Sequence, residues 1–172
     1  MKKYLIYGMN GSGQSTAGEE LERMGYYVIE ADSEPGLSYW VNRKTGERIN
    51  SNPPFTQKWL DENKWIWDSV KLPRLLRSNG ADEVFLVGGA DNMYDFMDLF
   101  DKKFVLHIDD ETMRERLQAR EPGRWENGSS ELKMVLGWNK NFVNYHRIPG
   151  AILISGAQPI EKVVAAILEN IK

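Results

Sequence analysis

The sequence contains no cysteine, and this absence excludes several kinds of chemistry at once. A chain of 172 residues without cysteine forms no disulfide, holds no metal through thiolates and has no cysteine nucleophile. Its two histidines, His107 and His146, are too few and too far apart for a convincing histidine-based metal site.

Long apolar runs and an excess of positive charge are also missing. No stretch of about 18 residues is continuously apolar, so we expect no membrane-spanning helix. The apolar run after Lys2 and Lys3 is too short for a secretory signal peptide, and we expect a cytoplasmic protein. The net charge of −3 argues against a nucleic-acid partner, which would need a basic face. A small anionic ligand needs only a local cluster of donors and is compatible with this composition.

Short apolar runs alternate with helical patterns along the chain. The runs are mostly continuous, as is typical of parallel strands covered on both faces. They are Tyr4–Tyr7, Tyr26–Glu30, Glu83–Val87, Phe104–Ile108 and Ala151–Ile154. Helical patterns cover Ser15–Met24, Asp110–Arg120 and the segment that begins at Pro159. The alternation predicts an α/β fold with a three-layer, doubly wound, five-stranded parallel sheet.

Two segments interrupt this alternation. We expect a single domain over residues 1–172, with a core at 1–32 and 81–172, an insertion at about 33–80 and a loop at about 121–130. Ligands of open α/β sheets bind beyond the carboxyl ends of the strands, so segments that emerge there are natural lids.

The stretch YLIYGMNGSGQSTAGEEL, residues 4–21, is typical of a phosphate-binding loop between a strand and a helix. Glycines such as Gly11 and Gly13 let backbone N–H groups converge on an anion at the start of the helix. Ser15 is placed to bind a magnesium ion that bridges phosphates. A glycine-rich turn without a ligand is the alternative interpretation.

Gln14 stands where the Walker A pattern has lysine. Glutamine donates hydrogen bonds but carries no charge, and the loss of one preorganised electrostatic partner typically costs ~3 kcal/mol in the transition state. We therefore expect phosphoryl transfer to suffer more than binding. Lys2, Lys3 or an arginine of the lid are candidates for a replacement cation, and Arg120 is favoured.

Polar and small residues follow the second and third predicted strands. Asp32 can hold magnesium through water or accept the proton of an attacking hydroxyl, or it caps a turn. Gly88 and Gly89 allow a substrate to approach the backbone closely, and Asp91 beside them is either a substrate ligand or a helix N-cap.

Arginines gather before and within the 121–130 loop. Arg116 and Arg120 are four residues apart on one helical face and can stack on an adenine or bind phosphate oxygens. Closure of the loop would bring Arg124 onto the transferring phosphate. A solvated charged face is the alternative for all three. The tryptophans, mostly in the insertion and the loop, form either an aromatic wall for a substrate or small-domain packing.

Taken in order, the phosphate loop, Asp32, Gly88-Gly89, the Arg-x3-Arg pair and the C-terminal SGAQPIEKV resemble small-molecule kinases of the adenylate kinase and shikimate kinase type. This resemblance implies a substrate-binding insertion and a lid that closes over ATP with magnesium. It implies phosphate contacts from Gly8, Asn10, Gly11, Ser12, Gly13, Gln14, Ser15 and Thr16. It also implies that Arg116 lies over the adenine, that Gln158 and Pro159 border it, that Arg120 reaches the phosphates, and that Ser15 and Asp32 hold the metal.

Three hypotheses follow for function. The first is an ATP-dependent kinase for a small acceptor, which is a nucleoside, a nucleotide or a shikimate-like hydroxyl compound. The second is a non-catalytic nucleotide-binding module or switch, and the third is a regulatory or protein-interaction domain that uses exposed aromatic residues. The sequence indicates no oligomeric state.

Overall fold

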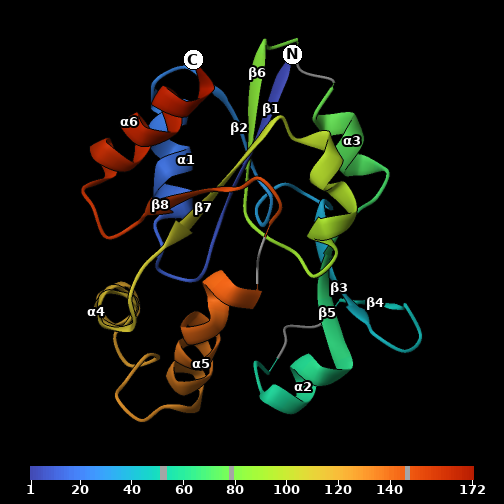
Figure 1. Cartoon of the computed structure of the whole chain (residues 1–172). Helices are drawn as coiled ribbons and strands as arrows, with labels where there is room; N and C mark the ends of the chain where they lie inside the picture. Colours follow the sequence, from blue (N-terminus) through green and yellow to red (C-terminus); the bar gives the residue numbers. More distant parts are fainter. Residues whose placement is uncertain (51–53, 78–79, 146–147) are drawn as a thin grey trace.

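The five apolar runs fold into one parallel sheet, as the sequence predicts. The computed structural model describes residues 1–50, 54–77, 80–145 and 148–172. The strand order is β2-β6-β1-β7-β8, and each neighbouring pair is parallel (Figure 1). The strands are β1 (Lys2–Gly8), β2 (Tyr27–Glu30), β6 (Glu83–Val87), β7 (Lys102–His107) and β8 (Ile152–Ser155). The predicted α/β fold is confirmed.

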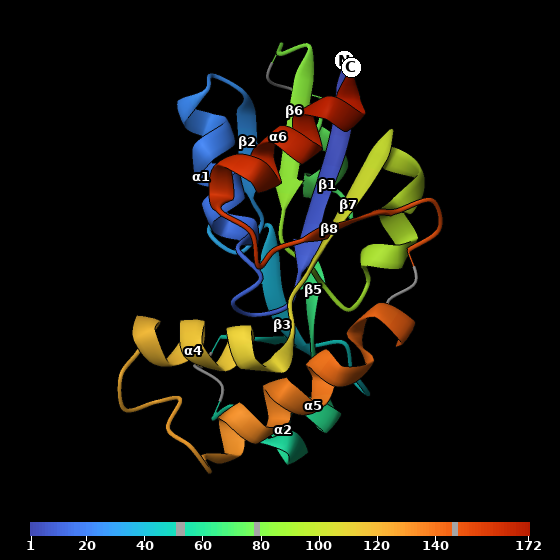
Figure 2. The ribbon, with the colours of Figure 1, turned by 60° about the vertical axis from the view of Figure 1, so that its left-hand side comes forward.

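Helices cover both faces of this sheet and complete three layers (Figures 1 and 2). Helices α1 (Gln14–Arg23) and α6 (Ile160–Ile171) pack on one face, against Tyr4 and Ile6 of β1 among others. Helix α3 (Lys71–Leu75) and the 3₁₀ helix η1 (Met93–Leu99) pack on the other, where β1 contributes Leu5 and Tyr7. Successive side chains of a strand point to opposite faces, so one apolar run supplies both cores.

Helix boundaries follow local signals in the sequence. Helix α1 starts directly after Gly13 and ends before Gly25, which has a φ of 92°. Helix α4 (Asp110–Arg120) has the predicted bounds, and the Asp109 carboxylate caps it by accepting from the Thr112 N–H at 2.7 Å. Pro159 precedes α6 as its N-cap.

A second, antiparallel sheet lies within residues 38–67, inside the segment predicted as the insertion. Its order is β4-β3-β5, with strands β3 (Ser38–Asn42), β4 (Arg48–Ile49) and β5 (Asn63–Trp67) and with α2 (Gln57–Glu62) directly before β5. Of the predicted insertion, residues 51–53 and 78–79 lie outside the described residues.

A third group of helices stands at the end of the sheet where β1 meets the glycine-rich loop. Helix α4, the 121–129 segment and α5 (Ser130–Tyr145) enclose a small core that includes Met113, Leu117 and Trp125. The buried Trp125 donates its indole N–H to Glu121 Oε2 at 2.9 Å, which ties the segment to the end of α4. None of the helices in the described ranges combines the length and the apolar character needed to cross a membrane.

Candidate functional site

The glycine-rich loop between β1 and α1 forms a nest of backbone amides. Gly11 and Gly13 have φ values of 79° and 92°, which glycine adopts without a steric penalty. The Ser12 N–H donates to the Met9 carbonyl oxygen at 2.9 Å and closes the turn. Gly13 supplies no side-chain cap to α1, so the first amides of this helix remain available to a ligand.

Two other glycines allow this loop to lie directly against the sheet. A Cβ atom on Gly8 would lie 2.3 Å from Ser12 Oγ, and one on Gly156 would lie 2.3 Å from the Ser12 carbonyl oxygen. The Gly156 N–H donates to the His107 carbonyl oxygen at 2.8 Å. The loop is therefore held between the ends of β1, β7 and β8, where only glycine fits without a shift.

A cavity of about 620 Å³, here called the phosphate pocket, opens over this loop. It is lined by residues 9–16, by Asp32, by Arg116, Leu117 and Arg120 of α4, and by Gly156, Gln158, Pro159, Ile160 and Val163. Arg116 donates from Nη1 to the Gly11 carbonyl oxygen at 3.0 Å. Arg120 makes no hydrogen bond or ion pair with the residues that the structure describes. The structure thus gathers the predicted loop residues, both α4 arginines and the turn before α6 around one cavity.

Gln14 lies between this pocket and a second one and lines both. Its Oε1 atom is buried and accepts no hydrogen bond within the described part of the chain, and the same holds for Ser12 Oγ. A buried polar atom without a partner costs about 1–3 kcal/mol, so a ligand that donates to Gln14 would relieve this cost. Neutral Gln14 therefore offers polar contacts without charge at the start of α1.

The residues predicted to hold magnesium lie beside the phosphate pocket, and a further carboxylate joins them. The Ser15 hydroxyl donates to Glu30 Oε1 at 3.4 Å. Burial raises the pKa of Glu30 from its ordinary value of 4.5 to about 7, and the nearby Asp32 carboxylate adds to the increase. Sequence reasoning missed Glu30, although its place at the carboxyl end of β2, two residues before Asp32, was a signal.

Asp32 stands where the two pockets meet and lines both. Its Oδ1 accepts a hydrogen bond from the Trp65 indole N–H at 2.9 Å. Asp32 faces solvent, yet the walls of the cleft desolvate its carboxylate and raise its pKa, while the bond from Trp65 acts in the opposite direction. Its second oxygen remains available to accept a proton or a hydrogen bond.

The second cavity, of about 670 Å³, is here called the aromatic pocket. Its aromatic walls are Tyr7, Trp40, Phe55, Trp65 and Trp138. Trp40 and Trp65 pair across β3 and β5, with ring centroids 5.2 Å apart, and Trp40 also packs edge-on against Trp59 at 4.7 Å. The rings that pack the small sheet therefore also line a cavity, and their use as an aromatic wall for a substrate remains a prediction.

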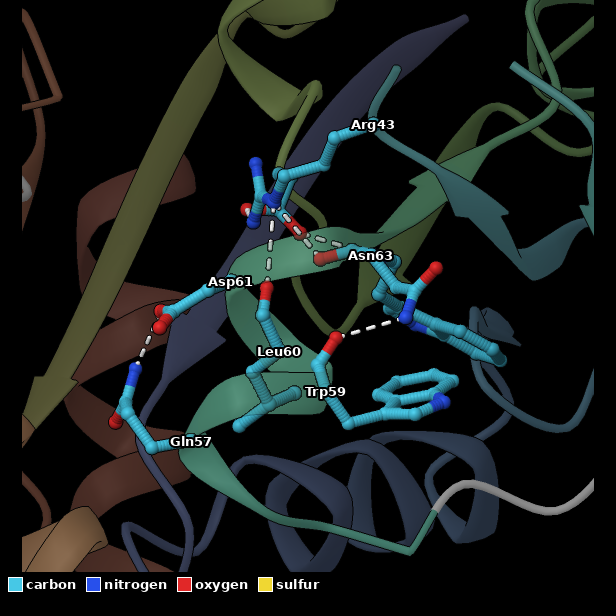
Figure 3. Close-up of polar contacts among 8 residues, drawn as sticks. Arg43, Gln57, Trp59, Leu60, Asp61 and Asn63 are labelled. Atoms are coloured by element: carbon cyan, nitrogen blue, oxygen red, sulfur yellow. Dashed lines mark hydrogen bonds and ion pairs between the residues drawn. The ribbon is translucent and has the colours of Figure 1, made fainter. Parts of the chain in front are cut away.

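Arg43 reaches over this cavity but is already bonded to the protein (Figure 3). Its Nε donates to the carbonyl oxygens of Asn63 at 2.8 Å and Leu60 at 3.3 Å, and its Nη2 lies 3.1 Å from Asp91 Oδ1. Below it in α2, Gln57 donates from Nε2 to Asp61 Oδ1 at 2.8 Å. Sequence reasoning missed Gln57 and Asp61, because a two-turn helix inside an insertion has no motif.

Asp91 and Asn92 fasten the second sheet to the first. Asp91 accepts from the Trp65 backbone N–H at 2.9 Å and donates its own N–H to the Trp65 carbonyl oxygen at 2.8 Å. Asn92 bonds in the same reciprocal way to the backbone of Trp67, with both bonds at 2.9 Å. Asp91 lines the aromatic pocket as predicted for a substrate ligand, but each of its carboxylate oxygens already has a partner in the protein.

The two glycines after β6 differ in what they touch. Gly89 lines the aromatic pocket, and a Cβ atom there would lie 2.3 Å from the Tyr7 ring. Gly88 has a φ of 125° and faces Ala31, and it is not among the described residues that line either pocket. The close approach at Gly89 is therefore to the protein's own tyrosine.

Arg124, predicted to reach the transferring phosphate, bonds within its own segment. Its guanidinium pairs with Glu121 at 3.1 Å and Glu131 at 2.8 Å and stacks over Trp125, with 4.7 Å to the ring centroid. It also lies 5.7 Å from the centroid of Phe55, a wall of the aromatic pocket. Arg124 does not line the phosphate pocket among the described residues, and its approach on closure remains a prediction.

Lys2 and Lys3 are wrong as candidates for the missing cation. They begin β1, whereas the glycine-rich loop follows its other end. Lys2 forms an ion pair with Asp101 at 3.0 Å. Within the described ranges, no group of three or more histidine, aspartate or glutamate side chains is arranged to hold a metal ion, and His146 lies outside those ranges.

The parallel sheet, its two helical layers and the glycine-rich loop between β1 and α1 together define the α/β fold of P-loop kinases. The chain itself belongs to the AAA domain family, whose model matches residues 5–133. No curated protein matches the sequence significantly. The narrower adenylate or shikimate kinase type remains a prediction.

Several solved structures share this fold over nearly the whole chain. A sugar kinase from Janibacter sp. HTCC2649 is 16% identical with a TM-score of 0.56, over 98% of this chain and 93% of that one. Deoxyadenosine kinase from M. mycoides with bound dATP is 15% identical with a TM-score of 0.54, over 98% of both chains. A gluconokinase from Sinorhizobium meliloti 1021 is 19% identical with a TM-score of 0.53, over 99% of this chain and 95% of that one. At these identities the likeness concerns the fold alone.

Proposed function

We propose that this protein is a small-molecule kinase that transfers the γ-phosphoryl group of ATP to a hydroxyl group of a small acceptor. One observation carries the proposal: the open amides at the start of α1 share a cavity with two arginines, and a second cavity meets it at Gln14 and Asp32. One anion site and one adjoining site are what a transfer between two small molecules requires. The named kinases that share the fold add support.

In this proposal ATP occupies the phosphate pocket. The backbone amides of the loop and the unpaired Arg120 bind the β and γ phosphates, which the positive end of α1 also favours. Arg116 stays bonded to Gly11, which holds the loop in shape while its guanidinium faces the nucleotide. Gln158 and Pro159 border the adenine.

The transfer itself requires positioning and charge stabilisation more than covalent help from the protein. The acceptor hydroxyl oxygen attacks the γ-phosphorus from the aromatic pocket, a new P–O bond forms, and the bond to the β,γ-bridging oxygen breaks. ADP leaves with that electron pair, and Asp32 accepts the proton that the hydroxyl loses. Arg120 stabilises the charge that a Walker A lysine would otherwise meet.

Magnesium fits the side chains at this position. The Ser15 hydroxyl would hold the ion directly and the Asp32 carboxylate would hold it through water, with Glu30 next to them, and all three offer oxygen atoms of the kind that magnesium prefers. When bound, magnesium would neutralise charge on the phosphate oxygens.

A second candidate is a nucleotide-binding module without transfer, because Gln14 leaves the loop without its usual charge. Both candidates predict that ATP with magnesium raises the thermal stability of the protein, by about 2.7 kcal/mol at 100 times its dissociation constant. Absence of any binding in calorimetry at low ionic strength would refute both.

Release of ADP with a panel of hydroxyl compounds separates the two candidates, and Gln14→Lys sharpens the result. For a kinase that relies on Arg120, the natural protein turns over and the substitution changes the rate by less than about tenfold. For a binding module, the natural protein is inert with every acceptor. Gln14→Lys then either creates turnover or gives a protein that still binds ATP without turnover.

A further inference from the structure

The charges of the two pockets differ in a way that bears on the acceptor. Among the described residues, the arginines and carboxylates that line the phosphate pocket are Arg116, Arg120 and Asp32, whereas those that line the aromatic pocket are Arg43, Asp32, Asp61 and Asp91. The first set has an excess of one positive charge when its groups are ionised, and the second has an excess of two negative charges. An anion that enters the aromatic pocket would therefore meet net repulsion.

Arg43, the arginine that lines the aromatic pocket, does little to offset this repulsion. Arg43 already bonds to two carbonyl oxygens and to Asp91, so its charge is balanced within the wall (Figure 3). Carboxylates and phosphates are usually recognised by arginine in a bidentate arrangement. Asp32 and Asp61 have no ion-pair partner among the described residues, and they would face such an anion directly.

The remaining features of the pocket suit a flat, uncharged molecule. Trp40, Phe55 and Trp65 line it, and aromatic faces of this kind stack on planar rings. The volume of about 670 Å³ is within the range of small-molecule sites. Asp32 and Gln14 at the shared wall would meet the end of the acceptor that carries the reacting hydroxyl.

The polar edge of α2 adds a preference for hydrogen-bond donors. Gln57 and Asp61 both line the pocket, and because Gln57 uses its amide N–H to bond Asp61 Oδ1, the remaining oxygens of this pair are Gln57 Oε1 and Asp61 Oδ2. Both are acceptors, and neither has a partner in the described part of the chain. A ring that carries an exocyclic amino group satisfies two adjacent acceptors.

We propose that the aromatic pocket selects an amino-bearing nucleoside, of the adenosine or cytidine kind, over acceptors that carry a phosphate or a carboxylate. This inference rests on the proposed function, since it identifies the aromatic pocket as the place of the phosphoryl acceptor. The base stacks on the tryptophan wall with its amino group toward Gln57 and Asp61. The sugar hydroxyl points to Asp32.

Binding measured by tryptophan fluorescence tests the selection without turnover. Cytidine, uridine, cytidine 5′-monophosphate and gluconate are titrated with ADP saturating the phosphate pocket and without it. We expect cytidine to bind at least tenfold more tightly than its monophosphate or gluconate, with uridine weaker than cytidine. Equal or tighter binding of either anion overturns the proposal, as does a failure of all nucleosides, adenosine included, to bind.

Asp61→Asn tests whether repulsion by carboxylates causes the selection against anionic acceptors. The matched control is Asp98→Asn, which changes an exposed residue of η1 outside both pockets. The ratio of monophosphate to nucleoside dissociation constants should fall about threefold or more in Asp61→Asn and stay unchanged in the control. An unchanged ratio in Asp61→Asn overturns the electrostatic argument. A parallel titration of ATP keeps the two proposals apart: failure of ATP to bind refutes the kinase, whereas ATP binding without nucleoside selection refutes only this inference.

Discussion

The phosphate pocket and the aromatic pocket share a wall but are built from different materials. The phosphate pocket is made largely of main chain, with glycines that bring amides together and two arginines from α4. The aromatic pocket is made of side chains from a separate small sheet and from α2, and its carboxylates outnumber its one arginine. In the proposed function, a polyphosphate would thus be recognised largely through backbone geometry and the acceptor through side chains.

In the proposed function, this contrast accounts for an anion site that has glutamine at position 14. Glycine conformations and the helix terminus supply positive potential whatever residue stands at position 14. In the proposed function the missing charge concerns the transition state more than the bound nucleotide, and Arg120 lines the phosphate pocket without a hydrogen bond or ion pair in the described structure.

We expect the largest effect from replacing Arg120, because its loss would reduce the difference in charge between the two pockets. Arg120→Ala should lower kcat by about 100-fold or more, because a preorganised charge facing the transferred group contributes ~3 kcal/mol. The dissociation constant of ATP should change far less. Steady-state kinetics and calorimetry measure the two quantities, with Arg114→Ala of the same helix, outside both pockets, as the control. A loss of affinity as large as the loss of rate would contradict this role.

A smaller effect should follow from altering the main-chain frame of the phosphate pocket alone. A Cβ atom on Gly156 would lie 2.3 Å from the Ser12 carbonyl oxygen, so Gly156→Ala must displace the loop. We expect a loss of about 1–3 kcal/mol in the free energy of unfolding and weaker ATP binding, with nucleoside binding largely kept. Gly137→Ala is the control, since its Cβ would meet no atom within 4 Å and alanine favours the helix interior. Equal denaturant midpoints for Gly156→Ala and the natural protein would show that the loop yields freely.

The same contrast explains why the sequence predicted the phosphate pocket better than the aromatic pocket. The phosphate loop could be found because backbone geometry of this kind demands glycines at fixed spacing between a strand and a helix, and Gly11 and Gly13 have the required conformations. The parallel strands were predicted because burial on both faces leaves a continuous apolar run.

The aromatic pocket could not be found in the same way. Its polar contacts join Arg43 to Asp91 and Trp65 to Asp32, residues far apart in the sequence with no spacing rule. Asp91 was selected for its place after β6, but its docking of β5 depends on a strand that the sequence did not predict. Arg124 was selected for its place in the loop, yet its ion pairs depend on how α4 and α5 pack together.

The smallest effect concerns Glu30, the carboxylate that accepts a hydrogen bond from Ser15 behind the phosphate loop. Burial and Asp32 raise the pKa of Glu30 from 4.5 to about 7, so the folded protein holds this proton more tightly than the unfolded chain. Its stabilising contribution is therefore present in full below about pH 4.5 and is lost as the pH rises to about 7. Solvent around Glu30 screens its charge and reduces the effect to about 1 kcal/mol. Denaturation at pH 5 and pH 8 should show that Glu30→Gln gains stability over the natural protein as the pH rises. The exposed Glu169→Gln should show no such gain, and a parallel pH dependence of the natural protein and Glu30→Gln would place the titrating group elsewhere.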